Sequence, residues 1–223
     1  MKNAENKEKL LSELLSQNGS FDSGLIIGVS GFARCGKNTL AEILSQYSSH
    51  LGLSTKMFSF AYALRQDLNS FCKEKFGISS FTEDTLDKGK IRSILIAYGQ
   101  SQRALSEGSY WWKKLMPEIN SFFSSGGNVA IISDLRFKEY GFDEVDFIRS
   151  YANSLIITLT RVCEDGTFVS PAHESESENF PKIASNADLN LTWKTVSKEE
   201  NSIIFESIPA INTLDRKLKE TFK

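Results

Sequence analysis

A glycine-flanked stretch near the start of the chain, residues 31–39, has the residue types of a loop that binds phosphate. It reads Gly-Phe-Ala-Arg-Cys-Gly-Lys-Asn-Thr and has the spacing Gly-x4-Gly-Lys. Gly31 and Gly36 can take backbone angles that a side chain forbids, so consecutive N–H groups can converge on one anion. Lys37 supplies a mobile positive charge, and a helix that begins there adds the positive end of its dipole. The pattern therefore predicts a site for the phosphates of a nucleotide.

The residue after Lys37 is Asn38, where a phosphate loop usually has a Ser or Thr hydroxyl that binds magnesium. Because an amide oxygen is a poorer ligand for magnesium, we expect nucleotide oxygens, waters and an acid elsewhere to hold the metal. Thr39 offers a hydroxyl one position later. The order Gly-Lys-x-Thr resembles small-molecule kinases of the adenylate kinase type more than GTPases or motor ATPases. A glycine-rich turn with a chance lysine is the alternative interpretation.

The elements that must position this loop alternate along the chain between apolar strands and helical patterns. We expect strands at 25–29, 55–60, 128–133, 155–159 and 188–193. Helical faces are predicted between them, whereas 77–90 reads as a polar, mobile loop. The alternation predicts an α/β fold with a mostly parallel five-stranded sheet and helices on both faces. In such sheets ligands bind beyond the carboxyl ends of the strands.

Composition narrows the class of protein. The chain has 223 residues and a net charge of −2, which implies no general attraction to nucleic acid. No apolar run has membrane-spanning length, and the N-terminus does not read as a secretion signal. Three scattered cysteines and two histidines argue against a structural zinc site and favour a reducing cytoplasm. Cys35 lies inside the loop, where we expect a packing role rather than a redox switch.

Charged residues follow the predicted strands. Asp134 and Arg136 come after the strand at 128–133, Arg65 follows 55–60 and Arg161 follows 155–159. An acid and several arginines at one rim of the sheet suit phosphoryl transfer, which depends mostly on positioning and charge neutralisation. Each charged residue also has a simpler interpretation. Asp134 could cap the next helix, and the arginines could be solvated charges.

Five short motifs resemble those of bacteriophage deoxynucleoside monophosphate kinases, in the same order along the chain. The phosphate loop of that family ends in Gly-Lys-Asp-Thr, where this chain has Gly-Lys-Asn-Thr. The other four motifs are Phe60-Ala61…Leu64-Arg65, Gly99-Gln100…Arg103 with Tyr110-Trp111, Ser133-Asp134-Leu135-Arg136-Phe137, and His173-Glu174-Ser175-Glu176. The match spans about residues 25–195. Departures at Asn38, Arg65 and Gln100 bear on metal handling and acceptor specificity.

The resemblance implies a P-loop kinase fold of the adenylate kinase type and transfer of the γ-phosphate of ATP to a deoxynucleoside monophosphate, with Mg²⁺. The residues implied to hold the donor phosphates are Gly31, Arg34, Gly36, Lys37, Asn38 and Thr39. Those implied to bind the acceptor are Arg65, Arg103, Trp111 and Arg136. The residues implied to be catalytic are Lys37, Asp134, Arg136 and Arg161. The metal would be bound by Thr39 and, through a water molecule, by Asp134.

The expected organisation is an N-terminal helical extension over 1–23 and a kinase domain over 24–223. That domain would contain a substrate-binding helical region at about 61–125 and a lid at about 162–181. The expected partners are nucleotide substrates, with no nucleic acid and no membrane. The resemblance favours a homodimer. The expected location is the cytoplasm, which would be the host cytoplasm if the chain is phage-encoded.

Two other functions stay open. One is a related P-loop kinase with another phosphorylated acceptor, of the phosphomevalonate or dephospho-coenzyme A type. The other is a nucleotide-binding module without catalysis. A GTPase is disfavoured because no Asn-Lys-x-Asp segment reads guanine, and a motor ATPase because no glutamate follows Asp134.

Overall fold

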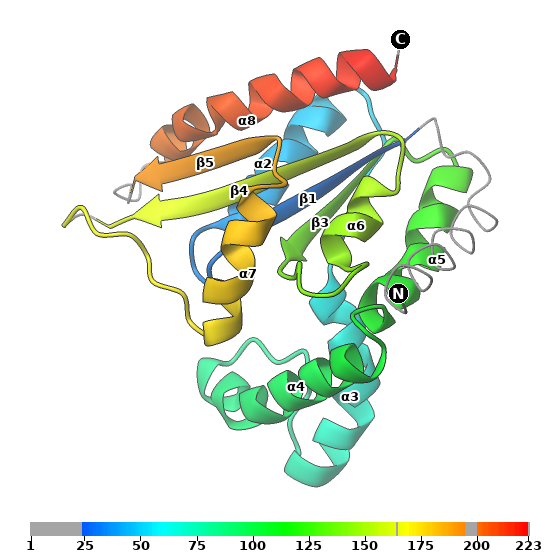
Figure 1. The fold of residues 1–223 in the computed structure, drawn as a ribbon, viewed down its shortest axis with the longest axis vertical. Coiled ribbons are helices and arrows are strands. Elements are labelled where there is room, and N and C mark those ends of the chain that lie inside the picture. The colour runs from blue at the N-terminus through cyan, green and yellow to red at the C-terminus, as the bar shows by residue number, and fades with distance from the viewer. Residues whose placement is uncertain (1–23, 164, 195–199, 223) are drawn as a thin grey trace.

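The computed structural model describes residues 24–163, 165–194 and 200–222, and within them five parallel strands form one sheet (Figure 1). The strands are β1 Leu25–Gly31, β2 Thr55–Phe58, β3 Val129–Leu135, β4 Ser154–Val162 and β5 Leu189–Lys194. Their order across the sheet is β2-β3-β1-β4-β5, so β1 lies at the centre and β5 at an edge. All four strand pairs are parallel. The predicted α/β fold class is confirmed.

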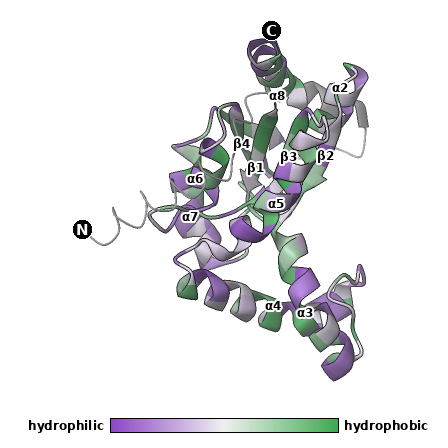
Figure 2. Ribbon diagram, turned by 90° about the vertical axis from the view of Figure 1, so that its right-hand side faces the viewer, coloured by the Kyte–Doolittle hydropathy of each residue, from purple (hydrophilic) through white to green (hydrophobic). Residues whose placement is uncertain are grey.

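Alternate residues of β1 face opposite sides of the sheet, and each side has its own apolar core. Leu25, Ile27 and Val29 pack under α2 Lys37–His50 and α8 Glu200–Thr221. Ile26 faces the other side, which is covered by α5 Tyr110–Ser124 and α6 Glu144–Arg149. The hydrophobic strands between these two layers are visible in Figure 2. Burial on both faces explains why β1 has no polar–apolar alternation.

Two helices, α3 Phe60–Phe76 and α4 Thr85–Leu105, extend from the sheet as an arm (Figure 1). The arm has a small core of its own around Leu68, Cys72 and Ile91. A further helix, α7 Glu174–Ala184, lies between this arm and the ends of the strands. The arm lies within the predicted substrate-binding region, and α7 overlaps the predicted lid.

Several predicted boundaries are wrong for local reasons. The second strand ends at Phe58 rather than residue 60, because the Ser59 hydroxyl caps α3 by accepting a hydrogen bond from the Tyr62 N–H. The fourth strand continues to Val162, so Arg161 lies within β4, opposite Trp193 of β5, rather than after the strand.

The predicted mobile loop at 77–90 is also partly wrong, because α4 begins at Thr85. Asp84 caps this helix by accepting hydrogen bonds from the N–H groups of Leu86 and Asp87. The predicted helix within 1–23 lies outside the described residues. No helix in the described part of the chain combines the length and the apolar composition that crossing a membrane requires.

Candidate active site

The predicted phosphate loop joins β1 to α2, with its glycines in conformations that other residues avoid. Gly36 has φ +102° and directly precedes the first residue of α2, Lys37. A β-carbon there would come within 2.6 Å of the Trp193 ring, and one at Gly31 would come within 2.3 Å of the Leu159 carbonyl oxygen. Backbone angle and close packing therefore both require glycine at these two positions.

The Lys37 ammonium lies across the loop. Its Nζ donates hydrogen bonds of 2.8 Å to the carbonyl oxygens of Gly31 and Phe32. Since an ammonium has three N–H donors, one remains for a ligand. Burial lowers the pKa of Lys37, and charges on Arg136, Glu176 and Asp134 also act on it. Asp134, within β3, and Arg136, just after that strand, are therefore close enough to Lys37 to influence its pKa.

The other predicted residues of the loop lie at its rim. Asn38 is exposed and Thr39 is half-buried, both in the first turn of α2. Arg34 is exposed, and its carbonyl oxygen accepts a 3.4 Å hydrogen bond from Nη1 of Arg161. Cys35 is fully buried, and burial raises the pKa of its thiol, which supports the packing role over a reactive thiolate.

Helix α7 contacts the phosphate loop, which the sequence did not indicate. Oε2 of Glu176 accepts a 3.3 Å hydrogen bond from the N–H of Ala33 and a 2.9 Å bond from that of Ala172. The Phe180 ring of α7 packs against Phe32 of the loop at 4.7 Å between centroids. A carboxylate thus occupies one of the backbone amides that the sequence predicts to bind phosphate.

Asp134, predicted to serve magnesium through water, holds the start of α3. Its Oδ1 accepts from the N–H of Phe60 at 2.9 Å, and its Oδ2 accepts from the N–H of Ala61 and the hydroxyl of Ser59, both at 2.8 Å. Three of the four lone-pair positions of the carboxylate are therefore taken. The remaining position leaves little room for a direct bond to a metal, and the role through a magnesium-bound water stays a prediction. No group of three or more candidate metal-ligating side chains occurs in the described residues.

A cavity of about 300 Å³ opens between the helical arm, the end of β3 and α7. Arg65 of α3 and Arg136, two of the residues predicted to bind the acceptor, both line it. A third arginine, Arg92 of α4, also lines it and was not predicted. Phe60, Trp111 and Phe137 contribute aromatic walls, and Asp134 and Glu176 lie at the side toward the phosphate loop.

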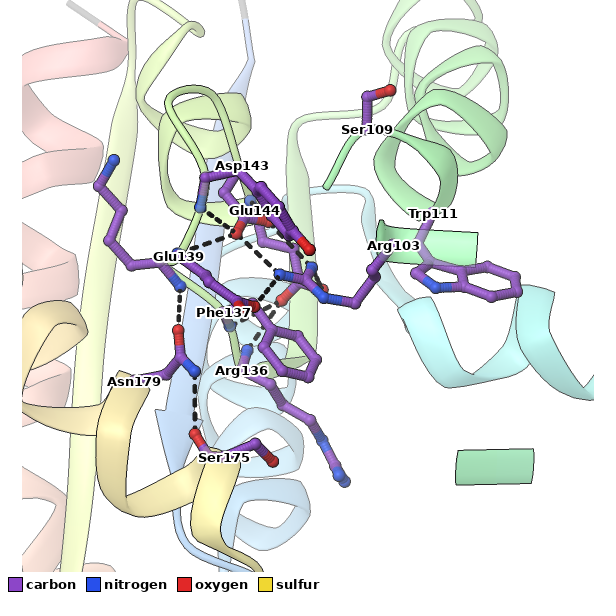
Figure 3. Close-up of polar contacts among 12 residues, drawn as sticks. Arg103, Ser109, Trp111, Arg136, Phe137, Glu139, Asp143, Glu144, Ser175 and Asn179 are labelled. Atoms are coloured by element: carbon purple, nitrogen blue, oxygen red, sulfur yellow. Dashed lines mark hydrogen bonds and ion pairs between the residues drawn. The ribbon is translucent and has the colours of Figure 1, made fainter. Parts of the chain in front are cut away.

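Arg103 lies in the cavity wall, but its guanidinium has partners within the protein, which corrects the expectation of a free phosphate-binding group. The side chain is 4% exposed and makes paired hydrogen bonds of 2.9 and 2.8 Å to Asp143. It also lies 3.6 Å from the centre of the Phe137 ring and 3.6 Å from Oε1 of Glu144 (Figure 3). Burial raises the pKa of the Glu144 carboxyl, and Arg103 opposes that shift.

Trp111 belongs both to the hydrophobic core and to the wall of the cavity. It is 4% exposed, and its indole N–H donates to the carbonyl oxygen of Gly99 at 3.3 Å. Trp112 beside it lies in the core, stacked on Phe147.

Arg92 could have been found from the sequence. It precedes Arg103 by eleven residues, about three helical turns, and so shares its face of α4.

No protein-family model matches the chain, and no curated protein sequence matches it. Among solved structures, a gluconokinase from Sinorhizobium meliloti 1021 aligns with 90% of this chain and 98% of its own. The sequence identity is 13% and the TM-score is 0.37. This similarity is too low for an inference about activity, which must come from the residues of the site.

Proposed function

We propose that the protein is an ATP-dependent nucleoside monophosphate kinase that transfers the γ-phosphate of ATP to a deoxynucleoside monophosphate, giving ADP and the diphosphate. One observation supports this most strongly. Glu176 lines the arginine-bordered cavity and also contacts Ala33 of the phosphate loop. An acceptor in the cavity and a triphosphate on the loop would therefore meet at this side chain. A Mg²⁺ ion bound with the nucleotide would neutralise charge on its phosphates.

The cavity suits an acceptor that carries both a phosphate and a flat ring. Arg65, Arg92 and Arg136 offer three cationic groups from three different segments. No general base is required, because the second ionisation of a phosphate monoester has a pKa near 6 and the attacking oxygen is already anionic. The aromatic walls at Trp111 and Phe137 favour a nucleobase over the branched aliphatic chain of phosphomevalonate.

Arg136→Ala should lower turnover by on the order of 10³-fold while the melting temperature stays within about 2 °C of wild type. Within the described part of the chain, Arg136 forms a hydrogen bond through its backbone N–H and not through its exposed side chain. Loss of that side chain therefore removes charge from the ligand site rather than packing. Steady-state kinetics with ATP and a monophosphate measures this. Arg216→Ala, at an exposed position of α8, is the matched control. A near-normal rate for Arg136→Ala would contradict the site.

Glu176→Gln should tighten binding of ATP or ADP about fivefold. The carboxylate competes with a phosphate at the Ala33 N–H, and like charges about 4 Å apart in water repel by about 1 kcal/mol. Calorimetric titration of the wild type and of Glu176→Gln measures the dissociation constants. Glu178→Gln, at an exposed position of the same helix, is the control. Unchanged affinity in Glu176→Gln would show that the glutamate does not oppose the nucleotide.

A substrate screen tests the proposed function and separates it from its alternatives. Wild-type protein with ATP and Mg²⁺ is offered the deoxyribo- and ribonucleoside monophosphates, phosphomevalonate and dephospho-coenzyme A. Conversion of at least one deoxynucleoside monophosphate to its diphosphate is expected. Turnover of only another acceptor supports the related-kinase reading, and nucleotide binding without any transfer supports the non-catalytic module.

A further inference from the structure

The segment that carries Arg136 has no helix or strand beyond Leu135, yet side chains hold its backbone throughout. The N–H groups of the five consecutive residues 136–140 all donate to side-chain oxygens. The acceptors come from three residues, Asp143, Glu144 and Asn179, which are 0%, 2% and 1% exposed. Surface loops usually leave such groups to water. Hydrogen bonds from three buried polar side chains therefore hold the backbone of one short loop.

Glu144 holds the part of the loop that presents Arg136. Its Oε2 accepts from the N–H of Arg136 at 2.9 Å and from that of Phe137 at 3.1 Å. Glu144 is the first residue of α6, but the helix does not use its carboxyl as a cap, because Asp143 and Asp146 already form a capping box. The carboxyl instead reaches back to the loop, where Arg103 lies 3.6 Å away.

The Arg136 side chain leads away from these carboxylates (Figure 3) and lines the cavity. Without an anchored backbone, nothing in the described contacts of the side chain would keep the guanidinium at the cavity. Asn179 secures the next peptide, since its Oδ1 accepts from the Lys138 N–H at 2.9 Å. Helix α7, which contacts the phosphate loop through Glu176, thus also holds the Arg136 loop.

We propose that Glu144, supported by Asn179, is a positioning residue that fixes Arg136 at the acceptor phosphate. This rests on the proposed kinase function. What fixes the loop is the side-chain oxygen of Glu144 that accepts the two backbone hydrogen bonds. Glu144→Gln keeps an oxygen at the same place and should therefore retain most of the rate. Glu144→Ala should lower kcat/KM by roughly 10- to 100-fold, because a small misplacement of a group that acts in the transition state is costly.

A double-mutant cycle with Arg136 tests the proposal. If Glu144 acts through Arg136, Glu144→Ala should cost less than about twofold in an Arg136→Ala background. Glu139→Gln, which also removes a carboxyl from Arg103 but accepts none of these backbone N–H groups, is the control with near wild-type kinetics. Equal losses from Glu144→Ala in both backgrounds would overturn the positioning role. If Glu144→Ala does not fold, Asn179→Ala carries the same expectation.

Amide hydrogen exchange gives a readout that is independent of activity. The amides of Arg136 and Phe137 should be protected in the wild type and in Glu144→Gln, and should exchange at least tenfold faster in Glu144→Ala. Protection that is unchanged in Glu144→Ala would overturn the inference even if the kinase proposal holds. If Glu144→Ala loses this protection but the wild-type protein has no kinase activity, the inference that Glu144 anchors the loop stands and the proposed function is wrong.

Discussion

Replacement of Lys37 by alanine is expected to lower the rate of phosphoryl transfer by on the order of 10³-fold and to weaken ATP binding. The Lys37 ammonium is held at two carbonyl oxygens of the loop with one N–H donor left for the ligand. Under the proposed function, this fixed charge would stabilise the negative charge that develops on the phosphates during transfer. Rapid-quench measurement of single-turnover ADP formation separates this loss from any loss of binding.

The fold should survive this change. Burial lowers the pKa of Lys37, which means that the folded protein disfavours its charged form and gains little stability from it. The melting temperature of Lys37→Ala should therefore stay close to that of wild type. Lys113→Ala, at an exposed lysine of α5, should be active and serves as the control. An active Lys37→Ala protein would place the donor phosphates somewhere other than this loop.

Arg103→Met should be the most destabilising of the substitutions considered. It leaves Asp143 and Glu144, both essentially buried, without the guanidinium that compensates them. Breaking one partner of a buried ion pair costs about 3–5 kcal/mol, which corresponds to a fall of roughly 10 °C in a chain of this length. Thermal unfolding followed by circular dichroism measures it.

Arg92→Met provides the comparison on the same helix face, because Arg92 is exposed. Its melting temperature should change by no more than about 2 °C, whereas its affinity for the acceptor should fall. Equal stability of the Arg103 and Arg92 variants would mean that the pairing with Asp143 is not structural, and Arg103 would again be available to bind phosphate.

The contrast between these two arginines shows what the sequence could and could not predict. The placement of the loop at 31–39 between a strand and a helix was predictable because it depends on residues that are neighbours in the chain. The five-stranded parallel sheet followed from alternating patterns of the same local kind. Arg103 was assigned to the acceptor phosphate because nothing local reveals that Asp143, forty positions away, binds its guanidinium.

The same reasoning applies to the acidic residues of α7. His173-Glu174-Ser175-Glu176 resembles a family motif, but nothing local reveals that Glu176 contacts the predicted phosphate loop across 143 positions of sequence. Asp134 illustrates a different case, because the helix that its carboxylate holds is not the next one along the chain. The next helix, α6, is capped by Asp143, whereas Asp134 holds the start of α3, about 75 positions earlier. Its role toward magnesium stays a prediction.

A crystal structure with a non-hydrolysable ATP analogue, Mg²⁺ and a deoxynucleoside monophosphate tests the central proposal most directly. The triphosphate is expected on the N–H groups of residues 31–39, with Glu176 displaced from Ala33. The monophosphate is expected in the cavity, with its phosphate among Arg65, Arg92 and Arg136. A nucleotide bound elsewhere, with Glu176 still on the Ala33 N–H, would contradict the assignment of donor and acceptor sites.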